Sequence, residues 1–189
     1  MTRYELLLFL HVATAVIWVG GATAVQLLAF RADRADDPME MHRVSSSAEW
    51  LATRVFVPSS VLVLLFGIAL VLDGPWGFDQ LWIVVGLAGY AFSFLVGTLF
   101  LSPETGRIAR GIEAHGPAHE TVLARIRRIL AVSRFELAVL FVVILDMSLK
   151  PAAGDGWFWV LTAAILLAGA AAALAGYRRP PARPAPDLA

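Results

Sequence analysis

The chain has 189 residues, of which 59% are hydrophobic and 16% are charged, and its formal net charge is zero. Soluble domains carry about 25% charged residues, so this composition predicts a membrane protein. The charge balance gives no indication of nucleic-acid binding, which needs an excess of basic residues. Cysteine is absent, which excludes disulfides, thiolate metal sites, covalently attached c-type haem and a cysteine nucleophile.

Five apolar stretches are each about as long as the ~20 residues that a helix needs to cross a bilayer. In chain order they are Leu6–Ala29, Val55–Leu72, Leu81–Leu101, Ile129–Leu149 and Trp157–Gly176. We therefore expect an all-α polytopic membrane protein whose five transmembrane helices form an antiparallel bundle, with one domain over residues 1–176. Residues 177–189 are rich in proline and arginine, and we expect them to form a disordered cytoplasmic tail.

The basic residues predict the orientation of the chain in the membrane. Thirteen of the fifteen lysines and arginines lie in or next to the connection between stretches one and two, the connection between stretches three and four, or the C-terminal tail. They are Arg31, Arg34, Arg43, Arg54, Arg107, Arg110, Arg125, Arg127, Arg128, Arg134, Arg178, Arg179 and Arg183. Because loops rich in lysine and arginine stay in the cytoplasm, we expect the N-terminus outside, the C-terminus inside, and location in the inner (plasma) membrane.

The longer connections carry signals for helix ends. Asp37-Pro38-Met39-Glu40 is typical of a helix start, with Asp37 as the N-cap, and Ser46-Ser-Ala-Glu49 predicts a second start that leads into the second stretch. Gly116-Pro117 predicts the end of one helix, and the next is expected to run from about Ala118 into the fourth stretch.

Small residues predict where helices approach one another. Gly86, Gly89, Ser93 and Gly97 are spaced so that they share one face of the third stretch. Such faces allow close packing between helices in lipid, and they would also allow a homo-oligomer. The expected surroundings are the lipid bilayer, without nucleic acid.

Three ionisable side chains at membrane depth define the candidate site: His11 in the first stretch, with Asp146 and Lys150 at i and i+4 in the fourth. Because the first stretch runs inward and the fourth outward, these residues and Met147 are expected in the outer third of the bilayer. Ionisable groups at that depth are costly and usually face the bundle interior. A structural alternative stands beside this interpretation: Lys150 extends to the lipid headgroups and Asp146 only forms an ion pair with it.

A second charged layer is expected at the inner end, from Glu49, Arg54, Glu104, Arg134 and Glu136. In the ordinary interpretation the arginines reach lipid headgroups and the carboxylates neutralise them. The alternative is a salt-bridge cluster that joins the second, third and fourth helices. The histidines of the connections, His42, His115 and His119, have a spacing that fits no closed metal site.

Six short motifs resemble a bacterial integral-membrane family called domain of unknown function 2269. They are Leu10-His11-x6-Trp18-Val-Gly-Gly21, Ala48-Glu-Trp50, Arg54-Val-Phe-Val-Pro58, Gly74-Pro-Trp-Gly77, Leu101-Ser-Pro-Glu-Thr-Gly-Arg107 and Asp146-Met-Ser-Leu-Lys-Pro151. The resemblance covers roughly residues 4 to 151 and leaves the fifth stretch outside. That family has no established activity, so the resemblance implies an architecture.

The shorter motif His11-x6-Trp18-x2-Gly21 is similar to the first helix of copper-resistance D-type membrane proteins and of HemJ-type protoporphyrinogen oxidases. In the latter, a first-helix histidine is associated with haem b and a lysine is also required. This resemblance implies haem b with His11 as the axial ligand of the metal and Met147, Lys150 or water opposite. Trp18 would line the porphyrin, Gly21 would let its edge approach, and Lys150 would neutralise a propionate. The candidate cofactor-binding residues are therefore His11, Trp18, Gly21, Asp146, Met147 and Lys150.

Three classes of function remain open at this point. The first is a redox protein of the helical-bundle type that binds haem b through His11. The second is a small proton-linked or metal transporter that uses His11 and Asp146. The third is a non-catalytic assembly or structural protein in which the charged residues only determine helix packing. No motif in the sequence identifies a catalytic group.

Overall fold

The structure is a computed structural model and describes residues 2–35, 37–117 and 119–177. All regular elements in these residues are helical: α1 (Arg3–Ala35), α2 (Pro38–Leu51), η1 (Ala52–Phe56), α3 (Val57–Asp73), α4 (Leu81–Val96), η2 (Gly97–Leu101), α5 (Ser102–His115), α6 (Glu120–Leu149) and α7 (Gly156–Tyr177). The α2–η1–α3 and α4–η2–α5 segments are continuous helices in which η1 and η2 are single π-helical turns. The predicted all-α fold is confirmed, while most of the predicted tail, residues 178–189, lies outside the described residues.

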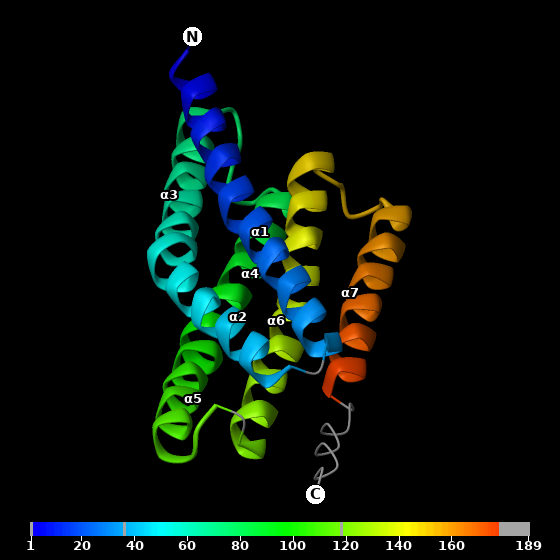
Figure 1. The fold of residues 1–189 in the computed structure, drawn as a ribbon. Coiled ribbons are helices and arrows are strands. Elements are labelled where there is room, and N and C mark those ends of the chain that lie inside the picture. Colours follow the sequence, from blue (N-terminus) through cyan, green and yellow to red (C-terminus); the bar gives the residue numbers. More distant parts are fainter. Residues whose placement is uncertain (1, 36, 118, 178–189) are drawn as a thin grey trace, which may run out of the picture.

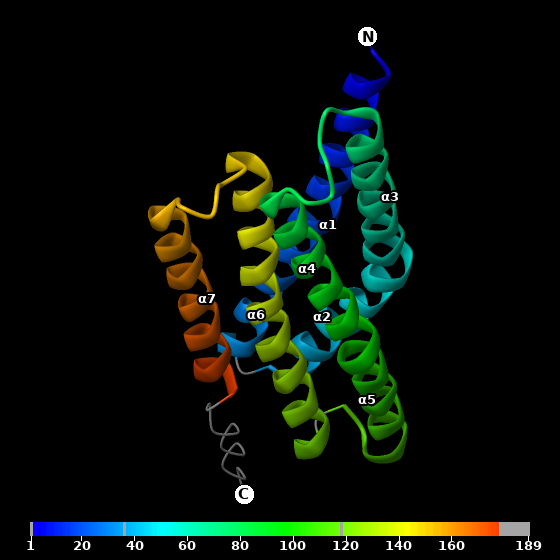
Figure 2. The same cartoon turned by 180° about the vertical axis from the view of Figure 1, so that it is seen from behind.

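The helices form an elongated bundle with α6 at its centre (Figures 1 and 2). α6 packs against α4 on one side and α7 on the other, and it also contacts α1 and α5. α1 packs mainly against α3. The N-terminus, the α3–α4 loop and the α6–α7 loop lie toward one end of the bundle, which we call the outer end (Figure 1). The α1–α2 connection, the α5–α6 turn and the end of α7 lie toward the other, arginine-rich end.

In the part of the chain that the structure describes, four helices are long and apolar enough to cross a membrane: Arg3–Ala35, Met39–Asp73, Leu81–His115 and Gly156–Tyr177. α6 is less apolar because Arg134, Glu136 and Asp146 interrupt its membrane-length segment. It runs antiparallel to both α4 and α7 and lies between them (Figure 2). Large apolar side chains cover the outside of the bundle, including Phe9, Val16, Leu27, Leu72, Leu99, Val160 and Leu167, which are each at least 65% exposed. This is the surface of a multi-pass membrane protein.

The first predicted helix start is confirmed and the second is wrong. The Asp37 carboxylate accepts hydrogen bonds from the backbone N–H groups of Met39 (2.9 Å) and Glu40 (3.3 Å). α2 then runs through Ser46 without a break. Once Asp37 has started the helix, Met41 becomes part of a buried apolar cluster, and the hydroxyl of Ser47 donates back to the carbonyl of Arg43 at 2.9 Å. The serines therefore lie inside a helix instead of capping one.

The predicted break at Gly116-Pro117 is confirmed. α5 ends at His115, and Gly116 takes the left-handed backbone (φ 87°) that glycine adopts without strain. α6 begins at Glu120 with His119 as its N-cap. The start that the sequence suggested, Ala118, lies outside the described residues.

Both π-helical turns precede a proline. η1 ends two residues before Pro58, and η2 ends two residues before Pro103. Proline has no N–H to donate, so it cannot continue the α-helical hydrogen-bond ladder, and a π turn is one way for the helix to absorb that defect. The helix therefore departs from regular α geometry just before Pro58.

The small face of α4 packs against α6, as the sequence indicated. A side chain at Gly86 would collide with Met147, and one at Gly89 would collide with Val143. Ser93 is 3% exposed on the same face, whereas the Cβ position of Gly97 has no neighbour within 4 Å. These contacts lie within one chain, so a homo-oligomer stays a prediction.

Candidate functional site

Asp146 is the most unusual polar residue of the outer half of the bundle. Its side chain is 0% exposed, and neither carboxylate oxygen has a hydrogen-bond partner in the described part of the chain. It lies in the last turn of α6 and faces α4, where a Cβ atom at Gly86 would be 3.8 Å from its Oδ2. Buried polar groups are nearly always hydrogen-bonded, so this carboxyl group needs a physical explanation.

Glycine at position 86 provides the room beside this carboxyl group. The methyl group of Met147 occupies the space that a side chain at position 86 would take. The close approach of α4 and α6 therefore encloses Asp146 and excludes lipid from it. Two of the predicted site residues, Asp146 and Met147, are brought together here.

Lys150 does not pair with Asp146. Its Nζ lies 4.3 Å from the ring centroid of Trp76 and 5.0 Å from that of Trp82, which are cation–π distances. Lys150 also ends α6 in the left-handed backbone region, with φ 47°, and this turns its side chain away from the preceding helix. The ion pair expected from the i,i+4 spacing is replaced by a contact between the end of α6 and the α3–α4 loop together with the start of α4.

His11 contacts α3. Its Nδ1 lies 2.9 Å from the carbonyl oxygen of Val63, and a carbonyl only accepts hydrogen bonds, so Nδ1 carries a proton and donates it. Nε2 then keeps a lone pair in the neutral tautomer. The same edge of the ring lies against Gly67, where a Cβ atom would be 3.1 Å from Cε1 and 3.4 Å from Nδ1. No described hydrogen bond or ion pair joins His11 to Asp146.

Two further predicted site residues pack against other helices. Trp18 makes an edge-to-face contact with Tyr90 of α4, with ring centroids 6.0 Å apart. Gly21 admits the ring of Phe56, whose Cε1 would be 2.7 Å from a Cβ atom at position 21. Both residues therefore fill the interior of the bundle.

The residues present fit haem b only in part. The hydrogen bond from His11 Nδ1 to a backbone carbonyl is the arrangement that orients a metal-ligating histidine. In contrast, Trp18, Gly21, Met147 and Lys150 already contact other protein groups, and no described hydrogen bond or ring contact joins them to His11. Among the described residues, no group of three or more histidine, aspartate or glutamate side chains is arranged to hold a metal ion.

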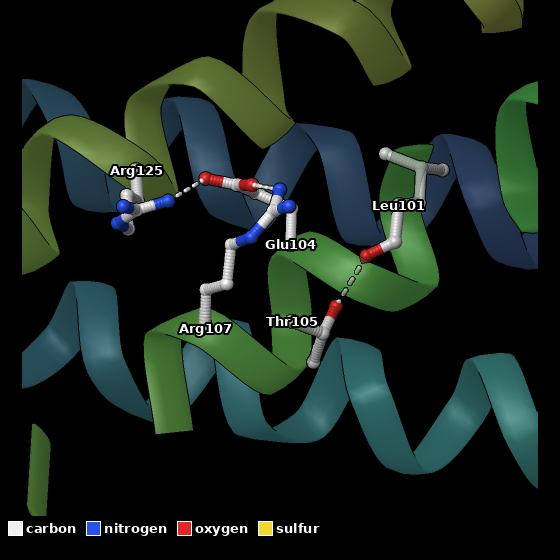
Figure 3. Close-up of polar contacts among 5 residues, drawn as sticks. All are labelled: Leu101, Glu104, Thr105, Arg107 and Arg125. Atoms are coloured by element: carbon white, nitrogen blue, oxygen red, sulfur yellow. Dashed lines mark hydrogen bonds and ion pairs between the residues drawn. The ribbon is translucent and has the colours of Figure 1, made fainter. Parts of the chain in front are cut away.

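The arginine-rich end holds a buried carboxylate that the sequence did not identify as buried. Glu104 of α5 is 0% exposed and accepts hydrogen bonds from Arg107 (2.8 Å) and Arg125 (2.5 Å), as Figure 3 shows. Arg107 is on the same helix and Arg125 is on α6, so the cluster joins these two helices. The only signal in the sequence was the i,i+3 spacing of Glu104 and Arg107.

A second cluster joins α1 to α6. Asp33 is 6% exposed, and its carboxylate oxygens lie 3.5 Å from Nε of Arg127 and 3.9 Å from Nη2 of Arg134. Asp33 was not predicted; it lies between Arg31 and Arg34, just beyond the first apolar stretch. The predicted salt-bridge cluster is thus present in part: Glu104 joins the third and fourth predicted helices as expected, whereas Asp33 and the first helix take part without having been predicted.

The fold and its polar residues define the class of this chain: a multi-pass, all-helical membrane protein whose described residues include two buried carboxylates at the arginine-rich end and one at the opposite end. The chain belongs to the family described as predicted integral membrane protein (DUF2269), which matches residues 5–151. This confirms the resemblance noted from the sequence motifs. No curated protein and no solved structure matches the chain. The matched region includes His11, Glu104 and Asp146 and ends before α7.

Proposed function

We propose that this protein is a small proton-linked transporter in which Asp146 takes up and releases the proton. The observation that carries the proposal is the complete burial of a carboxyl group without a hydrogen-bond partner, inside a helical bundle at membrane depth. Ionisable residues within membrane segments are rare and mark ion pathways or proton relays more often than they serve packing alone.

Charge is costly to bury in the interior of a helical bundle. An ionised carboxylate without a partner is far more expensive in an apolar interior than the neutral acid, so such a group takes up a proton. The neutral, protonated form of Asp146 therefore suits its apolar surroundings. It can ionise only when water or a cation reaches it from one side of the membrane, which is the condition for a carrier of protons.

Two other groups extend this path. Ser93 lies two turns inward of Gly86 on the same face of α4, and its hydroxyl is buried without a partner in the described part of the chain. His11, with its free Nε2, is a second group that binds and releases protons. Asp146, Ser93 and His11 thus supply polar groups from three different helices, α6, α4 and α1.

A chemical probe tests the protonation of Asp146 directly. Dicyclohexylcarbodiimide is apolar and reacts with protonated carboxyl groups that are shielded from water. We expect the purified protein to gain one carbodiimide adduct at Asp146, located by mass spectrometry of peptides. Asp146→Asn removes the adduct, whereas the control Asp79→Asn, which changes an exposed aspartate of the α3–α4 loop, keeps it.

Proton flux tests the function itself. In proteoliposomes with an imposed potential, we expect a pH-sensitive dye to report flux in the wild type and in Ser148→Ala, an exposed position on α6. The Asp146→Asn variant should show the background rate of empty liposomes while eluting as a folded protein. A wild type without flux and without the adduct would contradict the proposal and leave a structural role.

The proposal includes five crossings with the N-terminus outside the inner membrane. α4 and α7 run in the same direction along the bundle, and α6 returns between them (Figure 2). If α4 and α7 both cross the bilayer, α6 must also cross it. Apart from Arg3, the arginines of the described residues lie on segments of the half that would face the cytoplasm.

A second candidate function is haem b binding through His11. The observation in its favour is the hydrogen bond that fixes Nδ1 as the donor and leaves Nε2 free for an axial bond. Gentle purification from cells with ample haem should then give a Soret band that His11→Ala abolishes while the protein still inserts. A colourless wild type under these conditions removes this candidate.

A further inference from the structure

A cavity of about 260 Å³ opens at the arginine-rich end, between α1, α6 and α7. Its lining residues are Phe30, Asp33 and Arg34 of α1, Arg134 of α6, and Ala172, Ala175 and Gly176 of α7. These residues end the apolar parts of α1 and α7, where the hydrocarbon of a bilayer gives way to headgroups. None of them belongs to the outer site described above.

The charges at the cavity are unequal. Arg34 is exposed, its guanidinium carbon lies 4.3 Å from the ring centroid of Phe30, and it pairs with no carboxylate in the described part of the chain. Arg134 has 14% of its side chain exposed and lies 3.9 Å from Asp33, at the limit for an ion pair. Two cations thus face one carboxylate, and that carboxylate also lies 3.5 Å from Arg127. A bound anion would balance the excess positive charge of the two arginines at the cavity.

The α7 wall gives the cavity its shape. Ala172, Ala175 and Gly176 present almost no side chain, and a Cβ atom at position 176 would overlap the guanidinium group of Arg134. Glycine therefore allows Arg134 to lie against α7. The cavity therefore has an apolar wall with an arginine at its base. This combination suits a ligand that carries a phosphate group next to a hydrocarbon chain.

We propose that this cavity binds the phosphodiester headgroup of an anionic phospholipid from the adjacent leaflet, with Arg34 and Arg134 as its donors. Guanidinium groups bind phosphate oxygens through charge-assisted and often paired hydrogen bonds. Basic pockets between membrane helices near the headgroup level are suited to such lipids. The apolar wall of α7 would lie along the first part of an acyl chain.

The test compares lipids on the full-length protein. Mixed micelles that contain phosphatidylglycerol should raise its thermal midpoint more than micelles with the same amount of phosphatidylcholine, and native mass spectra should retain more of the anionic lipid. Arg34→Gln should weaken the apparent affinity for phosphatidylglycerol about fivefold, as expected for one basic residue at a membrane surface. Ala172→Leu, which fills the cavity without changing charge, should weaken it as well.

Matched controls lie on the same helices. Arg31→Gln removes an exposed arginine of α1 outside the cavity, and Ala171→Leu adds the same bulk to a neighbouring exposed position of α7. Both should leave the affinity unchanged. Equal losses in the Arg31 and Arg34 variants would mean general surface attraction, and equal stabilisation by inorganic phosphate alone would mean a free-anion site. Either result, or no preference between the two lipids, overturns the proposal.

Discussion

Lys150 combines a strained backbone with a favourable side-chain contact. Its φ of 47° lies in the left-handed region, which costs a non-glycine residue ~1–2 kcal/mol, while a cation–π contact contributes ~0.5–1 kcal/mol at an exposed site. Lys150→Ala loses the contact and keeps the strain, so we expect it to lower the free energy of unfolding by about 1 kcal/mol. Lys150→Gly loses both, so it should be at least as stable as the alanine variant.

Chemical or thermal unfolding in detergent measures this pair of variants. A double-mutant cycle with Trp76→Ala isolates the contact. If the ammonium group and the ring interact, the two substitutions together should cost less stability than the sum of the two single substitutions. If Lys150→Ala were neutral on its own and additive with Trp76→Ala, the ammonium group would be solvated and the contact energetically unimportant.

Asp146 should respond to substitution in the opposite way from a paired charge. Removing one member of a buried ion pair costs about 3–5 kcal/mol because it leaves the other member buried and unpaired. Asp146 has no such partner among the described residues, so Asp146→Asn, which keeps its shape, should leave the thermal midpoint unchanged or raise it. The measurement is a thermal unfolding curve beside Glu104→Gln, whose carboxylate holds two arginines. A loss of stability in the Asp146 variant equal to that of the Glu104 variant would mean that Asp146 has a partner.

At the scale of single elements, periodicity and composition were sufficient for the helices. The Asp37 cap and the break at Gly116 follow from local rules and are confirmed, and all five apolar stretches lie in helices, four of which qualify as membrane spans in the described residues. The Ser46 start failed because a capping signal has no effect inside a helix that has already begun. Which side chains meet could not be predicted, since spacing along one helix does not identify its neighbour. Lys150 therefore contacts two tryptophans instead of Asp146, and Glu104 accepts a hydrogen bond from an arginine 21 residues away.

The contact between α6 and α7 depends on glycine. A Cβ atom at Gly169 would overlap the Cβ of Ala138, which cannot move without its helix. We expect Gly169→Ala to destabilise the bundle by roughly 1–3 kcal/mol through overpacking. Gly20→Ala is the matched control, because nothing lies within 4 Å of that Cβ position. It should be neutral or slightly stabilising through helix propensity. Equal effects of the two substitutions in an unfolding assay would show that α7 is not closely held.

At the scale of the whole molecule, the family match leaves α7 out, although α7 packs against the rest of the bundle. The match ends at residue 151, yet α7 covers α6 along much of its length and closes the inner cavity. Helices α1 to α6 therefore carry the outer site, and α7 adds a layer that the family motifs did not predict. The packing of α7 against α6 could not be predicted from the sequence, because α7 has apolar residues around its whole circumference and no polar face that would indicate its orientation.

The direction of α6 decides the topology of the whole protein. If α6 crosses the membrane, the turn at Gly116 and the loop at Gly154 lie on opposite sides of it. Reporter insertions at these two glycines, which have open space around them, should then give opposite results: Gly116 cytoplasmic and Gly154 outside. An insertion at Gly77 in the α3–α4 loop should match Gly154, because both loops lie at the outer end. Should Gly116 and Gly154 report the same side, α6 would lie in one leaflet. Asp146 would then be an interfacial group, and a path for protons across the bilayer could not pass through it.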